Sequence, residues 1–118
     1  MRSAGARFED LALAHAQGNG LVLLARNFHC RHGELDLVMR DGEVLAFIEV
    51  RYRRGNAYGG AAASVGARKR ARLVAAARQF LQAHPSWARH ACRFDVIAID
   101  GDAAQPTFEW LRDAFQTD

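Results

Sequence analysis

Acidic side chains recur at two-residue spacing in the first half of the chain, within two runs that alternate polar and apolar residues. Glu34 and Asp36 belong to one run, and Glu49 and Arg51 belong to the next. Because side chains alternate along a strand, each pair lies on one face. Carboxylates gathered on neighbouring strands repel one another, so the group needs a positive charge to offset the repulsion. Mg²⁺ held by the three carboxylates is one candidate, because it prefers hard oxygen ligands, and Arg51 is the other.

Asp41-Gly42 separates the two runs and is typical of a two-residue hairpin turn. The strand pairs that such a turn predicts are Arg40 with Glu43, Glu34 with Glu49, and Asp36 with Phe47. All four polar residues then share one face of the hairpin. The opposite face carries apolar side chains for the core, namely Leu35, Leu37, Met39, Val44, Ala46, Ile48 and Val50. A solvated face whose charges protect the strands from aggregation remains the alternative to a metal site.

Helices and further strands must position this hairpin, and the pattern predicts the order α-β-β-β-α-β with an apolar tail. The predicted elements are a helix capped by Ser3 and ending near Ala16, strands over 21–27, 34–40 and 43–51, a helix over 67–83, and a strand over 93–100. A hairpin followed by a helix and a strand favours a right-handed crossover, with the new strand parallel to its neighbour. The tail over 107–115 is apolar enough to pack, but its pattern does not distinguish strand from helix.

Length and composition restrict the class of protein. The 118 residues are enough for a single domain over 1–118, and a 50% hydrophobic content excludes a disordered chain. Two cysteines far apart do not form the disulfide framework of a small secreted protein, and no apolar segment is long enough to span a membrane. We therefore expect a soluble, cytoplasmic protein. The formal net charge of +3 permits an anionic partner, and Lys69 is the only lysine among 16 basic residues.

The segments Gly33–Val38 and Ala46–Arg53 resemble the YraN family of small bacterial proteins. Further matches in order along the chain are Ala25–Phe28, Lys69 with Leu73, and Arg93–Ile97. The resemblance covers nearly the whole chain. It implies a restriction-endonuclease-like fold, with a three-layer α-β-β-β-α-β core and a mixed central sheet, similar to the archaeal Holliday-junction resolvases. It also implies metal-dependent hydrolysis of DNA, including branched DNA. A homodimer is compatible with it, because the related resolvases act as two-fold dimers.

The resemblance implies a nuclease site of the D-x(n)-E-x-K type that takes Mg²⁺ or Mn²⁺. Asp36 and Glu49 correspond to its acidic metal ligands, and the carbonyl of Val50 corresponds to a further ligand. Glu9 matches the helical glutamate that completes the acidic cluster of the resolvases. That match is incomplete, because the family has Gly just before the glutamate and this chain has Phe8. An exposed glutamate favoured by the helix dipole is the alternative.

The departure from the implied pattern is Arg51, which stands where the family has a catalytic lysine. Arginine stays protonated and cannot act as a base, but it can hold a phosphate oxygen and stabilise developing charge. Two hypotheses follow: a metal-dependent nuclease with Arg51 as electrostatic stabiliser, and a nucleic-acid-binding module that has lost catalysis. A protein-interaction module without nucleic acid is a third. Lys69 is not an obvious replacement, because it lies 18 positions further on, in the second predicted helix.

Basic residues cluster after the acidic hairpin and are candidates for nucleic-acid binding. They are Arg53, Arg54, Arg68, Lys69, Arg70 and Arg72, in addition to Arg51. Cations at a helix N-terminus oppose its dipole, so a phosphate backbone bound there would explain their presence. A solvated face of an arginine-rich helix is the alternative.

Overall fold

The computed structural model describes residues 4–53, 65–101 and 104–116, and within them the predicted order of elements is confirmed. The elements are α1 (Ala4–Gly18), β1 (Val22–Cys30), β2 (Gly33–Asp41), β3 (Val44–Arg53), α2 (Ala67–Ala83), the 3-10 turn η2 (Pro85–Trp87), β4 (Cys92–Asp100) and β5 (Thr107–Phe115). The apolar tail that the sequence left undecided is therefore a strand.

The strands form one mixed sheet in the order β1-β2-β3-β4-β5. Neighbouring strands are antiparallel except β3 and β4, which run parallel with Glu49 beside Val96 and Arg51 beside Ala98. A parallel pair needs a crossover connection, and α2 lies in it. The predicted parallel placement of the fourth strand is thus confirmed.

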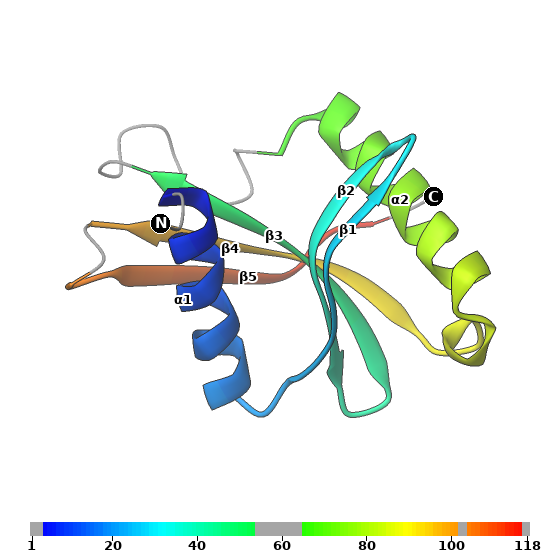
Figure 1. Cartoon of the computed structure of the whole chain (residues 1–118), viewed down its shortest axis with the longest axis horizontal. Coiled ribbons are helices and arrows are strands. Elements are labelled where there is room, and N and C mark those ends of the chain that lie inside the picture. The colour runs from blue at the N-terminus through cyan, green and yellow to red at the C-terminus, as the bar shows by residue number, and fades with distance from the viewer. Residues whose placement is uncertain (1–3, 54–64, 102–103, 117–118) are drawn as a thin grey trace.

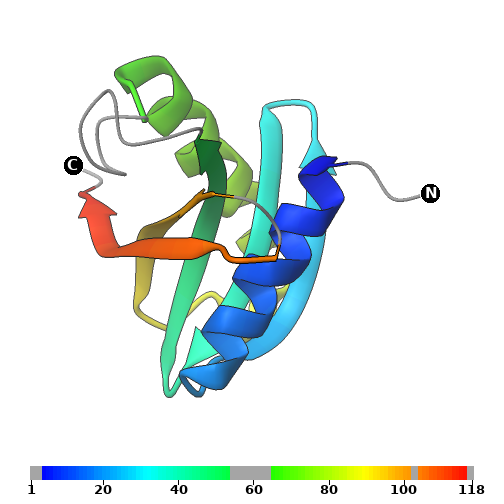
Figure 2. The same ribbon diagram turned by 90° about the vertical axis from the view of Figure 1, so that its left-hand side faces the viewer.

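The two helices cover opposite faces of the sheet, which makes the fold a three-layer α/β structure (Figures 1 and 2). Each helix buries one apolar stripe in its own core, as expected for amphipathic helices on a sheet. The α1 core combines Phe8, Ala12 and Ala16 with Leu37, Met39, Ala46, Ile48, Ile97 and Ile99. The α2 core combines Leu73, Ala77 and Phe80 with Leu35, Val38, Leu45, Phe47 and Val96. On the hairpin face that carries it, Glu49 is buried, whereas the side chains of Glu34 and Arg51 remain partly exposed.

The register of the β2–β3 hairpin differs from the prediction by two residues. Asp41 pairs with Val44, so the turn residues are Gly42 and Glu43 instead of Asp41-Gly42. Gly42 has φ 60° as the first central residue, and Glu43 is not among the residues with positive φ, which is the arrangement of a type II′ turn. A shift of two residues leaves every side chain on its predicted face but changes the residue that it meets.

The new register brings different carboxylates together. The β2–β3 ladder reaches Leu37 opposite Ile48, and continuing it by one residue places Asp36, instead of Glu34, across from Glu49. The predicted pairs of Glu34 with Glu49 and of Asp36 with Phe47 are therefore wrong.

Strand β2 changes neighbours at Asp36, and this bend also alters the core. Residues before Leu37 pair with β1 alone, whereas Leu37 to Arg40 pair with both β1 and β3. The start of β2 follows β1 toward α2 (Figure 1), so Leu35 packs in the α2 core while Leu37 packs in the α1 core. The predicted common face of Leu35 and Leu37 is wrong, because strict alternation holds only for a strand without a sharp bend.

Two expectations from the composition concern membrane-spanning segments and disulfides. None of the helices in the described ranges is long and apolar enough to cross a membrane. Cys30 and Cys92 both carry free thiols.

Candidate functional site

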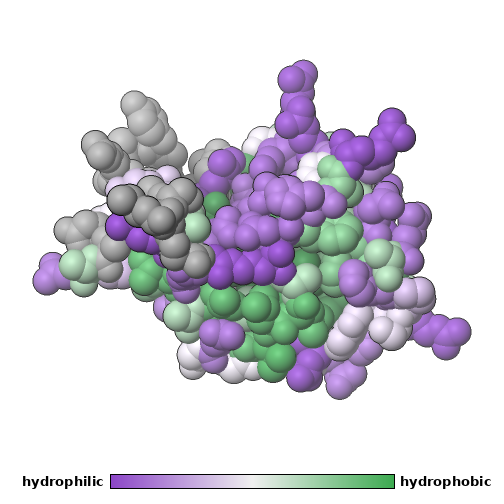
Figure 3. All heavy atoms as spheres, viewed as in Figure 1, coloured by the Kyte–Doolittle hydropathy of each residue, from purple (hydrophilic) through white to green (hydrophobic). Residues whose placement is uncertain are grey.

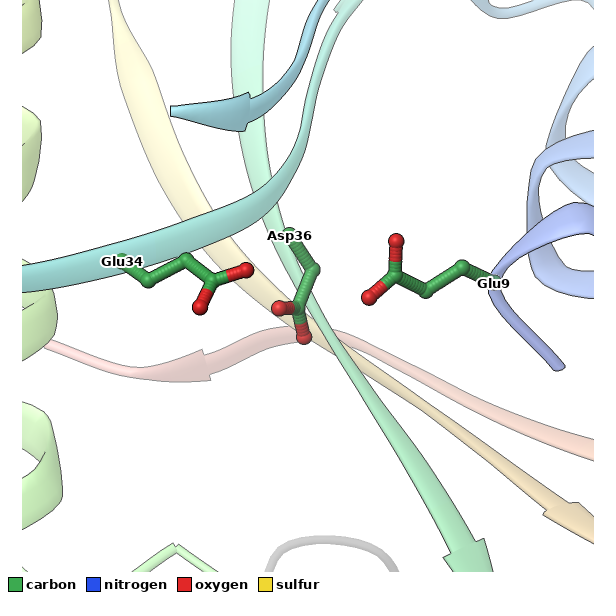
Figure 4. A group of neighbouring side chains, drawn as sticks. All are labelled: Glu9, Glu34 and Asp36. Atoms are coloured by element: carbon green, nitrogen blue, oxygen red, sulfur yellow. The ribbon is translucent and has the colours of Figure 1, made fainter. Parts of the chain in front are cut away.

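Three carboxyl groups converge beside the bend of β2. Glu9 reaches them from α1, while Glu34 and Asp36 extend from β2 (Figure 4), and one oxygen of each lies within 4.8 Å of the others. The charge of Glu49 acts on Asp36, and we call these four residues the acidic cluster. Helix α1 thus brings Glu9 to the hairpin residues, although Glu34 lies 25 positions further along the chain.

Glu49 is the most deeply buried member of the acidic cluster. Its side chain is only 5% exposed, and when Asp36 is ionised its Oε1 receives no hydrogen bond from any donor in the described part of the chain. Burial, followed by the charge of Glu49, raises the pKa of Asp36 from 3.8 to about 7. At neutral pH the surroundings of Asp36 therefore disfavour its ionised, negatively charged form.

The bend of β2 explains how Asp36 is held. Where β2 leaves β3, the N–H of Val50 loses its place in the ladder and donates to Oδ2 of Asp36 at 2.9 Å. The N–H and C=O of one residue in an extended strand point toward the same side, so the carbonyl of Val50 also faces this gap. The predicted ligands Asp36, Glu49 and Val50 are thereby adjacent.

Arg26 of β1 contacts Glu9 and its neighbours in the first turns of α1. Arg26 of β1 lies 3.5 Å from Glu9 and 2.7 Å from Asp10, and it also donates to the carbonyl of Ala6. Burial and the charge of Asp36 raise the pKa of Glu9, while Arg26 lowers it in part. The alternative of an exposed helix-start glutamate does not describe this residue, since its side chain is 18% exposed.

Phe8, which replaces the small residue of the implied motif, does not displace Glu9 from the cluster. Its ring stacks on that of Tyr52 with centroids 3.9 Å apart, and the residue is 8% exposed. The bulky side chain thus turns into the layer between α1 and β3, and leaves the neighbouring Glu9 free to point the other way.

Asn27 is a site residue that the sequence reasoning missed. In the amide orientation that its neighbours require, it donates to Oε1 of Glu9 at 3.0 Å and to Oε1 of Glu34 at 3.1 Å. Its φ of 56° is a left-handed conformation that asparagine tolerates better than most residues. An asparagine in the middle of a strand is unfavourable for β structure, and this was the available signal.

Two cations contact Glu49 at a single oxygen. Nζ of Lys69 lies 3.3 Å from Oε2, and Nε of Arg51 lies 3.6 Å from the same atom. Separation along the chain was therefore a poor guide to Lys69, because the crossover to β4 sets the start of α2 beside the end of β3. The only lysine of the chain stands at the acidic cluster.

The other basic residues predicted to bind nucleic acid differ in their surroundings. Arg68 and Arg72 are exposed on α2, whose first turn contains no acidic residue. Arg70 turns away: it donates to the carbonyl of Val65 and stands over the ring of Phe115 at 5.2 Å. Arg54 lies outside the described residues, as does the side chain of Arg53.

Hydrophilic side chains gather in the part of the molecule where both helices begin (Figures 1 and 3). The beginnings of α1 and α2 and the β1–β2 turn lie in the upper part of Figure 1. Hydrophilic side chains gather across this part in the matching space-filling view, with hydrophobic ones below them (Figure 3).

The acidic cluster fits a divalent cation by the chemistry of its donors. Glu9, Glu34 and Asp36 bring hard carboxylate oxygens together, and the neighbouring Glu49 has a buried Oε1 that lacks a donor within the described structure. A cation of charge +2 would also offset the repulsion that raises the pKa of Asp36. The residues present therefore suit Mg²⁺ or Mn²⁺.

Fold and site together define a three-layer α/β protein with an acidic cluster at a bend of its mixed sheet, next to the start of a basic helix. Residues 8–99 match the profile of the Uncharacterised protein family UPF0102, and the chain belongs to this family. It is 53% identical over 116 residues to a UPF0102 protein of Stutzerimonas stutzeri, covering 98% of this chain and 97% of that protein. It is 50% identical over 115 residues to one of Pseudomonas fluorescens, with coverages of 97% and 94%.

Proposed function

We propose that this protein binds DNA, including branched DNA, and hydrolyses its phosphodiester bonds with the help of Mg²⁺ or Mn²⁺. The observation that carries the proposal is the acidic cluster with two cations at its buried end. The resemblance to the YraN family, and through it to restriction-endonuclease-like resolvases, supports the same reading. The homodimer that those resolvases form and a cytoplasmic location are part of the proposal.

The residues have separable roles in this proposal. Asp36, Glu49 and the carbonyl of Val50 would hold the cation, with Glu9 and Glu34 completing its surroundings. When bound, such a cation polarises the phosphate and lowers the pKa of a water ligand. Asn27 keeps Glu9 and Glu34 in place through its two hydrogen bonds.

Arg51 and the exposed face of α2 would bind the DNA itself. Arg51 can hold a phosphate oxygen by a charge-assisted hydrogen bond. Arg68 and Arg72, together with Arg53 and Arg54, supply positive charge along the expected path of the backbone, with a strong dependence on salt. Such contacts position the DNA without reading its sequence.

A second candidate function is a DNA-binding module without catalysis, and Arg51 favours it. An arginine at the family's lysine position preserves phosphate binding better than it preserves activation of a water molecule.

The test is a cleavage assay on junction, flap and linear DNA with Mg²⁺ or Mn²⁺. It compares the wild type with Asp36→Ala and Arg51→Lys. Cleavage by the wild type that Asp36→Ala abolishes is the result expected for the nuclease. A wild type that binds but never cuts, together with an Arg51→Lys variant that cuts, would refute the enzyme and leave the module.

A further inference from the structure

The start of α2 places the only lysine of the chain at the buried end of the acidic cluster. Nζ of Lys69 is 3.3 Å from Oε2 of Glu49, and the Lys69 side chain is 40% exposed. The ammonium group therefore touches a buried carboxylate on one side and remains open to solvent on the other.

Arg51 reaches the same oxygen but differs in what it can offer. Its Nε lies 3.6 Å from Oε2 of Glu49, and its side chain is 35% exposed. The guanidinium is a rigid planar fork, whereas the ammonium of Lys69 is a compact charge with three donors that rotate freely. Lys69 can thus keep one donor on Glu49 and direct another toward a bound oxygen.

The surroundings of Lys69 also favour an anion. The first turn of α2 has no acidic residue, and its N-cap, Gly66, makes no side-chain capping hydrogen bond. The N–H groups of that turn have no partners within the helix, so they add positive potential beside the ammonium. The second, independent feature is Glu49, which is 5% exposed and has an oxygen that receives no hydrogen bond in the described residues. This unpaired acceptor does not itself favour an anion; it points to a cation at the acidic cluster, beside the ammonium of Lys69.

We propose that Lys69 is the lysine of this site, contributed by α2 instead of β3, and that its ammonium binds the phosphodiester group that is cleaved at the acidic cluster. This inference rests on the proposed function. Arg51 then binds the neighbouring backbone and is not the group on which cleavage depends. No change in the protonation of Lys69 is required, because the ammonium acts as a fixed positive charge.

The step that Lys69 assists is hydrolysis. The oxygen of a water molecule forms a bond to phosphorus, one P–O ester bond breaks, and one proton of the water ends on the leaving oxygen. The products are a phosphate monoester and an alcohol. Negative charge grows on the phosphoryl oxygens and the leaving oxygen in the transition state, and an ammonium group held beside them stabilises it.

The first arm of the test measures single-turnover cleavage with Mg²⁺ and, separately, DNA affinity in EDTA. We expect Lys69→Gln to lower the cleavage rate about 100-fold or more, the loss typical of removing one such donor. DNA affinity should change far less. Arg51→Gln should weaken affinity more than it slows cleavage of bound DNA. Arg89→Gln removes one exposed cation after η2 and serves as the matched control.

The second arm uses the fact that Lys69 is the only lysine, and it does not depend on cleavage. An amine-reactive acetylating reagent modifies its side chain, and mass spectrometry measures the rate with and without saturating linear or junction DNA in EDTA. We expect DNA to slow the acetylation of Lys69 about 5-fold or more, by direct contact with phosphate. The α-amino group of the same chain is the internal reference.

The outcomes separate the inference from the proposed function. Unchanged acetylation of Lys69 in DNA-saturated protein, or cleavage by Lys69→Gln within about threefold of the wild type, overturns the role of Lys69. Protection of Lys69 in a wild type that never cuts DNA refutes the nuclease and the cleavage role, while the phosphate contact stands. A protein that binds no DNA refutes both.

Discussion

The proton on Asp36 makes the stability of the metal-free protein depend on pH in an unusual direction. In the folded protein, burial and the charge of Glu49 raise the pKa of Asp36 to about 7, whereas the ordinary value is 3.8. Between these values the folded state holds a proton that the unfolded chain has released. The contribution of Asp36 to stability is therefore fully present below its ordinary pKa and is lost as the pH rises through 7, opposite to the usual carboxylate.

The size of the effect follows from the two pKa values. Each unit of difference corresponds to about 1.4 kcal/mol, so between about pH 5 and pH 8 Asp36 removes about 2.5 kcal/mol from the free energy of unfolding. Asp36→Asn keeps the shape of the side chain but cannot ionise. The variant should lack most of this decline, and at about pH 8 it should be more stable than the wild type.

Urea unfolding in EDTA at several pH values measures the effect. Glu43→Gln is the matched control, because its side chain is 91% exposed at the β2–β3 turn, away from the cluster. Parallel pH profiles of the wild type and Asp36→Asn would refute the reasoning. Millimolar Mg²⁺ should restore stability to the wild type at about pH 8, by binding the folded state alone, and should do far less for Asp36→Asn.

Three further predictions concern other residues of the fold and site. Asn27→Gly keeps the left-handed backbone but removes the two hydrogen bonds to the acidic cluster. Calorimetry should therefore show an Mg²⁺ affinity about 10-fold lower, and an unchanged affinity would exclude a positioning role for Asn27. Asp95 is 1% exposed and accepts hydrogen bonds from Arg93, Trp110 and the backbone of β5. Asp95→Ala should therefore lower the free energy of unfolding in urea by about 3 kcal/mol, and a decrease below about 1 kcal/mol would contradict this account. If Arg68 and Arg72 bind phosphates, changing each to Gln should reduce the slope of log affinity against log salt by about 0.9, and an unaltered slope would show that they do not contact DNA.

Element order and most strand faces could be predicted because both follow from local periodicity, but the bend of β2 separated Leu35 from the face of Leu37. The alternation along β2 and β3 placed Asp36, Glu49 and Arg51 on one face, and the hairpin–helix–strand order predicted the parallel β3–β4 pair. The tail stayed undecided, because β5 contains Asp113, whose φ of 54° interrupts regular alternation, and a shift in its register with β4. Such an irregularity hides the period of a strand.

The hairpin register could not be predicted as reliably as the faces. A two-residue shift preserves every inside and outside position, so the hydrophobic pattern does not resist it. The turn alone decides between the two registers, and Gly42 suits either the first or the second central position of a tight turn. That choice determined whether Glu34 or Asp36 lies across from Glu49.

By itself, the sequence determined the α-β-β-β-α-β order, the amphipathic stripes of both helices and the polar face of the hairpin, because each depends on residues within a few positions. Only the tertiary structure decided which charges meet. Packing α1 against the sheet brought Glu9 to Asp36 of β2 and Asn27 of β1, and the crossover set Lys69 of α2 beside Glu49. Contacts between elements depend on how the layers stack, and the local periodicity of the sequence does not predict that arrangement.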